Sequence, residues 1–228
     1  MRSSPLPTGS AVLDGLLGSY PPGVLTMLYG PAGAGKSTCA FLAVLQVLSE
    51  NSKAVYIDTE RNFSPERLAE LAGYAFREKQ FSEVLSRILL MQPADLDAQC
   101  SSVASAAALA RSARIGLIVV DTIGAHYRRA RPSGAKDANA LLRGQLDVLS
   151  AVAKETETMV LLTNQVFQRV EYGGVGIIGG AMLGQRCKCQ VELQKDGRGR
   201  RAVLRRHPER QGDVSYDIAA EGIVAKRE

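Results

Sequence analysis

A glycine-rich segment near the N-terminus constrains this chain more than any other feature. Residues 30–37 are Gly-Pro-Ala-Gly-Ala-Gly-Lys-Ser, which fits the phosphate-binding pattern G-x-x-x-x-G-K-[ST]. The apolar run 24–29 predicts a buried strand before it, and 38–48, which contains no Gly or Pro, predicts a helix after it. The pattern therefore has the strand–loop–helix context in which backbone N–H groups and a helix N-terminus bind an anion.

The residue types in this segment predict ATP and Mg²⁺ as ligands. Lys36 is expected to reach the β- and γ-phosphates, and the Ser37 hydroxyl to bind Mg²⁺. A chance glycine turn before a helix is the alternative, and the intact context favours the nucleotide. The predicted phosphate-binding residues are Gly30, Pro31, Ala32, Gly33, Ala34, Gly35, Lys36, Ser37 and Thr38.

The rest of the chain predicts an α/β fold with a parallel sheet flanked by helices. Continuous apolar strands of this kind are typical of a parallel sheet that is buried on both faces. They are expected at 54–58, 86–91, 115–120 and 158–162, and helices at 64–72, 95–112 and 139–155. Later strands, joined in one place by the turn pair Asp196-Gly197, predict antiparallel hairpins at the C-terminal edge. Residues 1–228 are expected to form a single domain, with loops at 122–137 and 168–181.

The composition excludes a membrane-spanning or secreted class. No run approaches the roughly 18 apolar residues that cross a bilayer, and the N-terminus lacks the apolar centre of a signal peptide. We therefore expect a protein of the cytoplasm or nucleoid. Cys187 and Cys189, spaced two apart in a strand-like run, are expected to point to one face. No further ligands suggest a zinc site there.

Polar residues follow three of the predicted strands, where the strand ends of such a fold gather beside the nucleotide. Asp121 is placed to hold Mg²⁺ through water, although a carboxylate that starts a turn is the alternative. Glu60 is a candidate to orient the attacking water, and a surface glutamate near a helix start is equally consistent with the residues alone. Gln165 could sense the γ-phosphate or simply cap a strand.

Two segments combine cations with aromatic rings, the mixture that binds single-stranded nucleic acid. The net charge of +5 is compatible with a nucleic-acid partner. Two mobile surface loops are the alternative. The candidate DNA-binding residues are Tyr127, Arg128, Arg129 and Arg131, with His126 beside them, in the first segment and Phe167, Arg169 and Tyr172 in the second.

Several motifs together resemble the RecA/RadA recombinase family, over about residues 6–224. The resemblance rests on the P-loop, on Asp121, on the Leu-Pro-Thr-Gly start at 6–9 with Leu-Asp at 13–14, on the segment 56–68 with its pattern T-E-x-x-F-x-P-E-R-L, and on 163–166. It implies a RecA-like ATPase core. Among recombinases the chain is similar to short archaeal paralogues, because the core starts almost at Met1 with no helical N-terminal domain before it.

The resemblance also implies roles for individual residues. Glu60 would activate the attacking water, Arg67 would pack against the adenine, and Gln165 would couple the γ-phosphate to the loop that follows it. The segments 124–137 and 167–181 would correspond to the two DNA-binding loops. Arg61 stands where the family usually has Gly, and we expect its guanidinium to pair with Glu60 and slow hydrolysis.

The resemblance implies an accessory protein of homologous recombination and DNA repair with weak, at most DNA-dependent, ATPase activity. Its implied partners are single-stranded DNA, the main recombinase of the RadA type, a Holliday-junction resolvase and further copies of itself. Two alternatives stay open: an active strand-exchange recombinase, and a KaiC-like signalling ATPase that binds no DNA.

Overall fold

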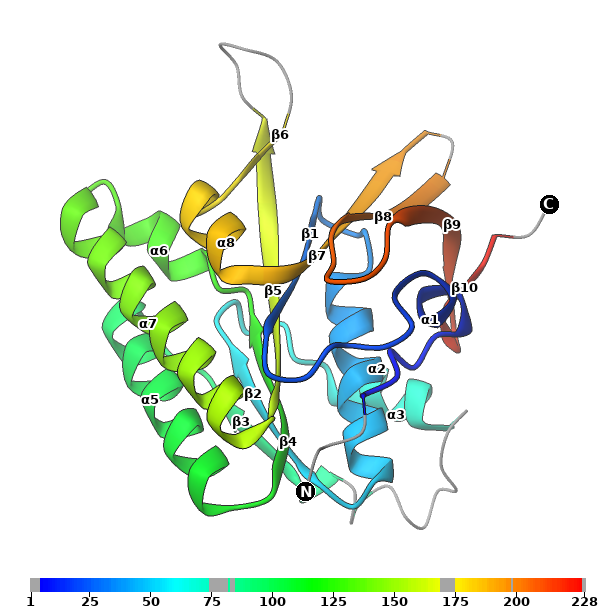
Figure 1. The fold of residues 1–228 in the computed structure, drawn as a ribbon, viewed down its shortest axis with the longest axis horizontal. Helices are drawn as coiled ribbons and strands as arrows, with labels where there is room; N and C mark the ends of the chain where they lie inside the picture. The colour runs from blue at the N-terminus through cyan, green and yellow to red at the C-terminus, as the bar shows by residue number, and fades with distance from the viewer. Residues whose placement is uncertain (1–4, 74–81, 83–84, 169–174, 198, 227–228) are drawn as a thin grey trace.

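The computed structural model describes residues 5–73, 82, 85–168, 175–197 and 199–226. The described part of the chain contains one sheet of ten strands with helices on both faces (Figure 1). Along the path β10-β9-β8-β7-β1-β5-β4-β2-β3 each strand is hydrogen-bonded to the next, and β6 pairs with β5 outside this path.

The strands from β7 to β3 along this path are parallel to one another. The apolar runs predicted this for β1 to β5, whereas β7 was expected only as part of the C-terminal hairpins. They are β1 (Leu25–Gly30), β2 (Lys53–Asp58), β3 (Ile88–Met91), β4 (Ile115–Asp121), β5 (Met159–Gln168) and β7 (Cys187–Asp196). Strands β8 (Gly199–Arg206), β9 (Gly212–Ala219) and β10 (Gly222–Ala225) continue the sheet in antiparallel order, which confirms the predicted C-terminal hairpins. Strand β6 (Val175–Ile177) runs antiparallel to the end of β5.

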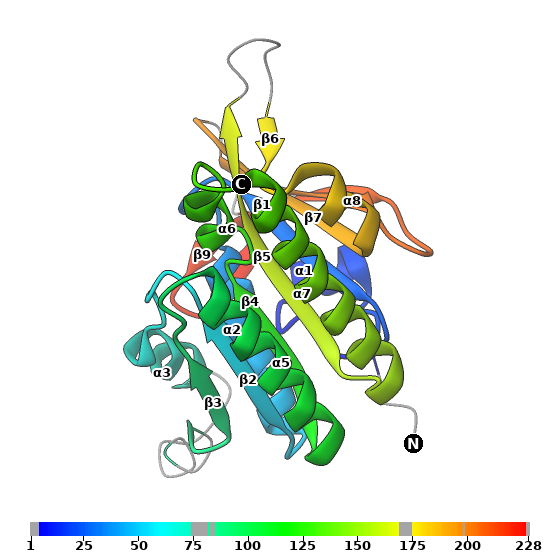
Figure 2. The same cartoon turned by 90° about the vertical axis from the view of Figure 1, so that its left-hand side faces the viewer.

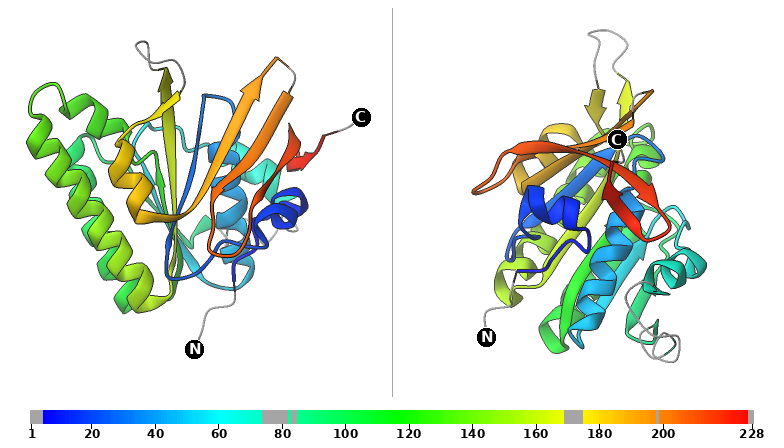
Figure 3. Two further views of the ribbon diagram at one scale, coloured as in Figure 1. Left: turned by 45° about the horizontal axis from the view of Figure 1, so that its top comes forward. Right: turned by 90° about the vertical axis from the view of Figure 1, so that its right-hand side faces the viewer.

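The two faces of the sheet bury two separate apolar clusters. Helices α5 (Leu96–Ser112) and α7 (Ala135–Thr156) cover one face, as Figure 2 shows. Helix α2 (Lys36–Ser49) lies on the other face, where it also contacts α3 (Pro65–Gly73) and β10 (Figure 3). The sheet and these elements enclose α2, so nearly all of its side chains from Cys39 to Leu48 are buried. A helix on the protein surface would bury only one stripe of its side chains.

The N-terminal segment is tied to the C-terminal edge of the sheet. Helix α1 (Ala11–Leu17) begins at the N-cap Ser10, whose hydroxyl accepts a hydrogen bond from the backbone N–H of Leu13. The same hydroxyl donates to the carbonyl oxygen of Ile223 in β10 at 2.7 Å. None of the helices in the described ranges is long and apolar enough to cross a membrane.

Three expectations from the sequence are wrong. Residues 122–137 are not wholly a loop, because α6 (Ala125–Ala130) forms there and α7 already begins at Ala135. The segment 168–181 contains β6 and the start of α8 (Gly180–Arg186). Cys187 and Cys189 lie on opposite faces of the sheet, because the register shifts between Leu25 and Thr26, their respective partners in β1.

Candidate functional site

The glycine-rich segment forms a tight loop between β1 and α2, as predicted. Gly35, the residue before the first helical residue, has φ of +93°, a left-handed conformation that residues with a Cβ rarely adopt. The loop therefore leads directly into the N-terminus of a helix of 14 residues. Unpaired N–H groups in the first turn of a helix and its partial positive charge favour an anion at this point.

Lys36 is the cation of this loop and is only 8% exposed. Its ammonium group donates to the carbonyl oxygens of Gly30 at 2.9 Å and Pro31 at 2.8 Å. Burial lowers the pKa of Lys36, while the nearby carboxylates of Asp121 and Glu60 act in the opposite direction. The ammonium is thus held at the loop, within the electrostatic reach of both acidic candidates.

Asp121 ends β4 and is buried, with both of its carboxylate oxygens engaged. The Tyr56 hydroxyl donates to Oδ2 at 2.6 Å, and the Thr163 hydroxyl donates to Oδ1. Mg²⁺ needs only one or two protein oxygens when phosphates and water supply the rest. The Asp121 carboxylate and the Ser37 hydroxyl fit that requirement, and no cluster of three or more His, Cys, Asp or Glu side chains among the described residues offers another metal site.

Glu60 and Gln165 are brought together from segments far apart in sequence. The side-chain amide of Gln165 donates to both carboxylate oxygens of Glu60 at 3.0 Å. Gln165 is also the register partner of Gly30, the first residue of the P-loop. The two side chains therefore contact each other beside the loop.

Asp58 is a residue that the sequence analysis missed. Its buried carboxylate accepts hydrogen bonds from the backbone N–H groups of Glu60, Asn62 and Phe63, at 3.3, 3.1 and 3.0 Å. The Gln92 amide donates to it as well, at 3.1 Å. Asp58 therefore fixes the backbone that carries Glu60. The available signal was an aspartate at a strand end, a residue type that commonly accepts hydrogen bonds from the backbone a few positions later.

The structure tests the pairing expected for Arg61 and shows which residues Arg67 contacts. Arg61 has φ of +57°, so this position does adopt the left-handed conformation that suits a glycine. Among the ion pairs of the described residues, however, none joins Arg61 to Glu60, so the expected pairing is not found. The guanidinium of Arg67 donates to the carbonyl oxygens of Ala219 at 2.8 Å and Ala220 at 3.0 Å, so it contacts the turn between β9 and β10.

The first candidate DNA-binding segment is largely helix α6. Arg128, Arg129 and Arg131 are exposed there. Tyr127 is only 5% exposed, and its hydroxyl donates to Asn139 Oδ1 at 2.8 Å. Most of its ring is therefore covered, although Tyr127 also lines a cavity beside α6, and its contact with DNA stays a prediction.

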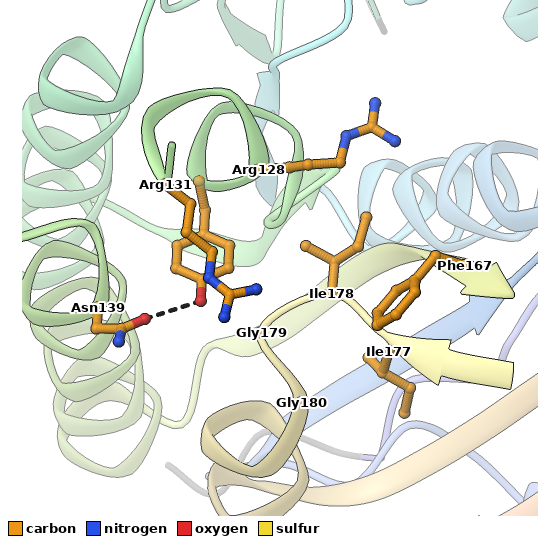
Figure 4. A pocket seen from close by; sticks show the side chains of 9 residues that line it. Arg128, Arg131, Asn139, Phe167, Ile177, Ile178, Gly179 and Gly180 are labelled. Carbon is orange, nitrogen blue, oxygen red and sulfur yellow. Dashed lines mark hydrogen bonds between the residues drawn. The ribbon is translucent and has the colours of Figure 1, made fainter. Parts of the chain in front are cut away.

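The second candidate segment is described only in part. Phe167 lies on β5 and is 47% exposed, whereas Arg169 and Tyr172 lie outside the described residues. Phe167, Arg128 and Arg131 line one cavity between α6 and the β5–β6 hairpin (Figure 4). The structure thus brings the two predicted segments together.

His126 connects α6 to the loop that follows β3. Its side chain is 3% exposed, and Nε2 lies 3.1 Å from the carbonyl oxygen of Pro93, which requires a proton on Nε2. Nδ1 faces the Arg129 guanidinium at 3.5 Å. Burial lowers the pKa of His126 below its usual value and Arg129 adds to this, while the Pro93 carbonyl, Asp95 and Glu60 oppose it. The fold therefore favours the neutral imidazole.

Replacing His126 by Gln is expected to make the stability of the protein less sensitive to acid. Because the folded state binds the His126 proton more weakly than the unfolded state, the free energy of unfolding falls as the pH drops below about 6.5. In the variant, the slope of the free energy of unfolding against pH should be smaller by the equivalent of up to one bound proton. Urea unfolding between pH 7.5 and 5 measures this slope. His207 is present in both proteins and serves as the internal control. Equal pH slopes would show that His126 does not contribute.

A P-loop between β1 and α2, a mostly parallel sheet and an antiparallel C-terminal extension together define a RecA-like core. The model of the Rad51 family matches residues 3–225, and the chain belongs to that family. This confirms the resemblance found in the sequence.

Individual relatives match over nearly their full length. The DNA repair and recombination protein RadB of Methanoculleus marisnigri is 33% identical over 228 residues, which cover 98% of this chain and 99% of that protein. RadB of Thermococcus gammatolerans is 38% identical over 223 residues, covering 96% and 97%. A crystal structure of the RadB recombinase matches with a TM-score of 0.80 at 36% identity, covering 97% of this chain and 100% of that chain.

Proposed function

We propose that this chain is an ATP-binding and DNA-binding accessory protein of homologous recombination and DNA repair, built as a single RecA-like domain. The observation that carries the proposal is the meeting of Lys36, Asp121 and the Glu60–Gln165 pair at one edge of the sheet. Its relatives are named as DNA repair and recombination proteins, which supports the same process for this chain.

Each residue of this edge has a distinct part in the proposed ATPase. Lys36 would exchange its two carbonyl partners for phosphate oxygens, which are charged and therefore stronger acceptors. Ser37 and Asp121 would hold Mg²⁺, which when bound would offset negative charge on the phosphates. Glu60 would orient a water molecule and accept its proton. Arg67 would border the adenine next to the β9–β10 turn.

The Glu60–Gln165 pair supports slow intrinsic hydrolysis. While the Gln165 amide donates to both oxygens of Glu60, the carboxylate is less available to a water molecule. A γ-phosphate that competes for this amide would release Glu60. We therefore propose turnover well below the roughly 10 per second of a median enzyme.

The proposed DNA-binding surface consists of the exposed arginines of α6 and the β5–β6 hairpin, with Arg169 and Tyr172 beyond the described residues. The other arginine-rich region, β8, is less available because Arg201 pairs with Asp213 and Arg205 with Glu192. Single-stranded DNA is the proposed ligand, and the RadA-type recombinase, a Holliday-junction resolvase and further copies of the chain are proposed partners.

Changing Arg128, Arg129 and Arg131 together to Ala is expected to flatten the salt dependence of single-strand affinity. Each cation that neutralises a phosphate contributes about −0.7 to the slope of log affinity against log salt, so the slope should change by about two units. Fluorescence anisotropy at several salt concentrations measures this, with Arg111, Arg114 and Lys154 changed to Ala as a charge-matched control. A triple variant with wild-type affinity and slope would show that this surface does not bind DNA and would favour the signalling-ATPase alternative.

A strand-exchange recombinase remains the second candidate, because the family includes recombinases. It requires the chain to polymerise on DNA in the presence of ATP. Electron microscopy of the protein with single-stranded DNA and ATP separates the two: continuous filaments would support strand exchange, and their absence would support the accessory role.

A further inference from the structure

The C-terminal strands of the sheet pack against the P-loop of the same chain. A Cβ on Gly30 would lie only 2.0 Å from the carbonyl oxygen of Leu193 in β7, so the loop begins in direct contact with this part of the sheet. A Cβ on Gly33 would lie 3.1 Å from the ammonium group of Lys195, near the end of the same strand. The loop is therefore supported from one side by residues that do not belong to its own motif.

Two side chains from the next strands donate hydrogen bonds to the loop. The Tyr216 side chain in β9 is 0% exposed, and its hydroxyl donates to the carbonyl oxygen of Ala34 at 2.6 Å. Arg200 in β8 is the register partner of Tyr216, and its Nε donates to the carbonyl oxygen of Gly33 at 3.3 Å. Burial raises the pKa of Tyr216, so its hydroxyl stays protonated and remains a donor.

Fixing these two carbonyl groups also fixes two N–H groups of the loop. In a planar trans peptide, such as both of these, the C=O and N–H bonds point in opposite directions. The Gly33 carbonyl belongs to the same peptide unit as the Ala34 N–H. The Ala34 carbonyl shares its unit with the Gly35 N–H. Because the carbonyl oxygens face Arg200 and Tyr216, the two N–H groups point away from β8 and β9.

The Ala34 N–H points toward the same place as the ammonium group of Lys36. It donates to the carbonyl oxygen of Pro31 at 3.3 Å, and the Lys36 ammonium donates to the same oxygen at 2.8 Å. Two donors of the loop thus converge on one acceptor, and a charged phosphate oxygen is a stronger acceptor than a carbonyl. A hydrogen bond to the carbonyl of a peptide unit also polarises that unit and strengthens its N–H as a donor.

We propose that Tyr216 and Arg200 are positioning residues of the ATP site, which orient and polarise the N–H groups of Ala34 and Gly35 for the phosphates. This rests on the proposed ATP-binding function and extends the site to the C-terminal strands β8 and β9. Neither side chain has to touch ATP, because each acts through a carbonyl group of the loop.

Tyr216→Phe tests this role, since it removes the hydroxyl and keeps the buried ring. The dissociation constant for ATP with Mg²⁺ is expected to rise about 3- to 10-fold, the range for one hydrogen bond. The loss should appear in affinity more than in the single-turnover rate at saturating ATP, because the N–H groups bind the phosphates in the ground state and the transition state alike. A merely structural role would lower the unfolding temperature without changing ATP affinity well below that temperature. Calorimetry and thermal unfolding of the nucleotide-free protein measure the two quantities.

Arg200→Ala is the second variant, and it is expected to weaken ATP binding by a similar factor. Arg201→Ala is its matched control, because it removes the same charge from the next residue of β8, which pairs with Asp213 instead. Tyr20→Phe is the matched control for the hydroxyl. Tyr20 is also buried, and its hydroxyl has no hydrogen-bond partner among the described residues. Both controls should bind ATP as the wild type does.

Failure of the positioning role can be distinguished from failure of the proposed function. If Tyr216→Phe and Arg200→Ala bind ATP with wild-type affinity, ATP binding stands and the positioning role is overturned. Equal losses of affinity in Tyr20→Phe and Arg201→Ala would overturn it as well, because the effect would then not depend on contact with the P-loop. If the wild type does not bind ATP, the proposed function itself is overturned, and the positioning role with it.

Discussion

Lys36→Ala is expected to abolish detectable ATP binding or to weaken it by at least about 100-fold. The ammonium is the only side-chain cation of the P-loop, and it is already buried at the position from which it would reach the phosphates. A charge-assisted hydrogen bond contributes about 1.5–3 kcal/mol, and Lys36 has the capacity for more than one. Isothermal titration calorimetry with ATP and Mg²⁺ measures the affinity of both proteins.

Lys53→Ala is the matched control, because Lys53 is an exposed lysine at the start of β2, the opposite end of that strand from Glu60. The ATP affinity of Lys53→Ala should equal that of the wild type. Equal ATP binding by Lys36→Ala and the wild type would refute the assignment of the nucleotide site.

Glu60→Gln is expected to lower the rate of ATP hydrolysis by about 10²- to 10⁴-fold and to leave ATP affinity nearly unchanged. This is the range that a positioned general base contributes. Gln has the shape of Glu but cannot accept a proton from water, and its carbonyl oxygen can still accept from Gln165. Phosphate release under single-turnover conditions gives the rate, and calorimetry gives the affinity.

Glu66→Gln, an exposed carboxylate on α3, removes the same charge nearby and should leave the rate unchanged. If Glu60→Gln hydrolyses ATP at the wild-type rate, another group activates the water molecule.

The sequence predicted the central sheet and the large helices because each carries a long periodic or continuous apolar pattern. Helices α6 and α8 were missed because they have six and seven residues, and their N-caps, Gly124 and Gly179, make no side-chain capping hydrogen bond. The opposite faces of Cys187 and Cys189 depend on a bulge opposite β1. A bulge depends on the register between two strands that are far apart in sequence. The residue pattern of one strand alone therefore does not predict it.

In the candidate site, too, some residues could be predicted from local sequence patterns and others could not. The P-loop and Asp121 follow from local patterns, since a motif and a strand end are visible in the sequence. The contact between Glu60 and Gln165 joins residues that are 105 positions apart, and only the order of β5, β4 and β2 in the sheet brings them together. The burial of Tyr127 depends on Asn139 of α7, so the local mixture of aromatic and basic residues could not distinguish it from Phe167.

Strand β5 sets a fixed separation between the proposed ATP site and the proposed DNA-binding surface. Gln165 is in register with Gly30 of the P-loop and Phe167 with Gly176 of the hairpin, and both belong to one unbroken strand. Two residues of extended chain span about 7 Å, and they point to the same side. Loss of Val166 would therefore turn the aromatic ring to the other side of the strand while the amide stayed in place. Substitutions are compatible with this arrangement, but a change of length between 165 and 167 is not.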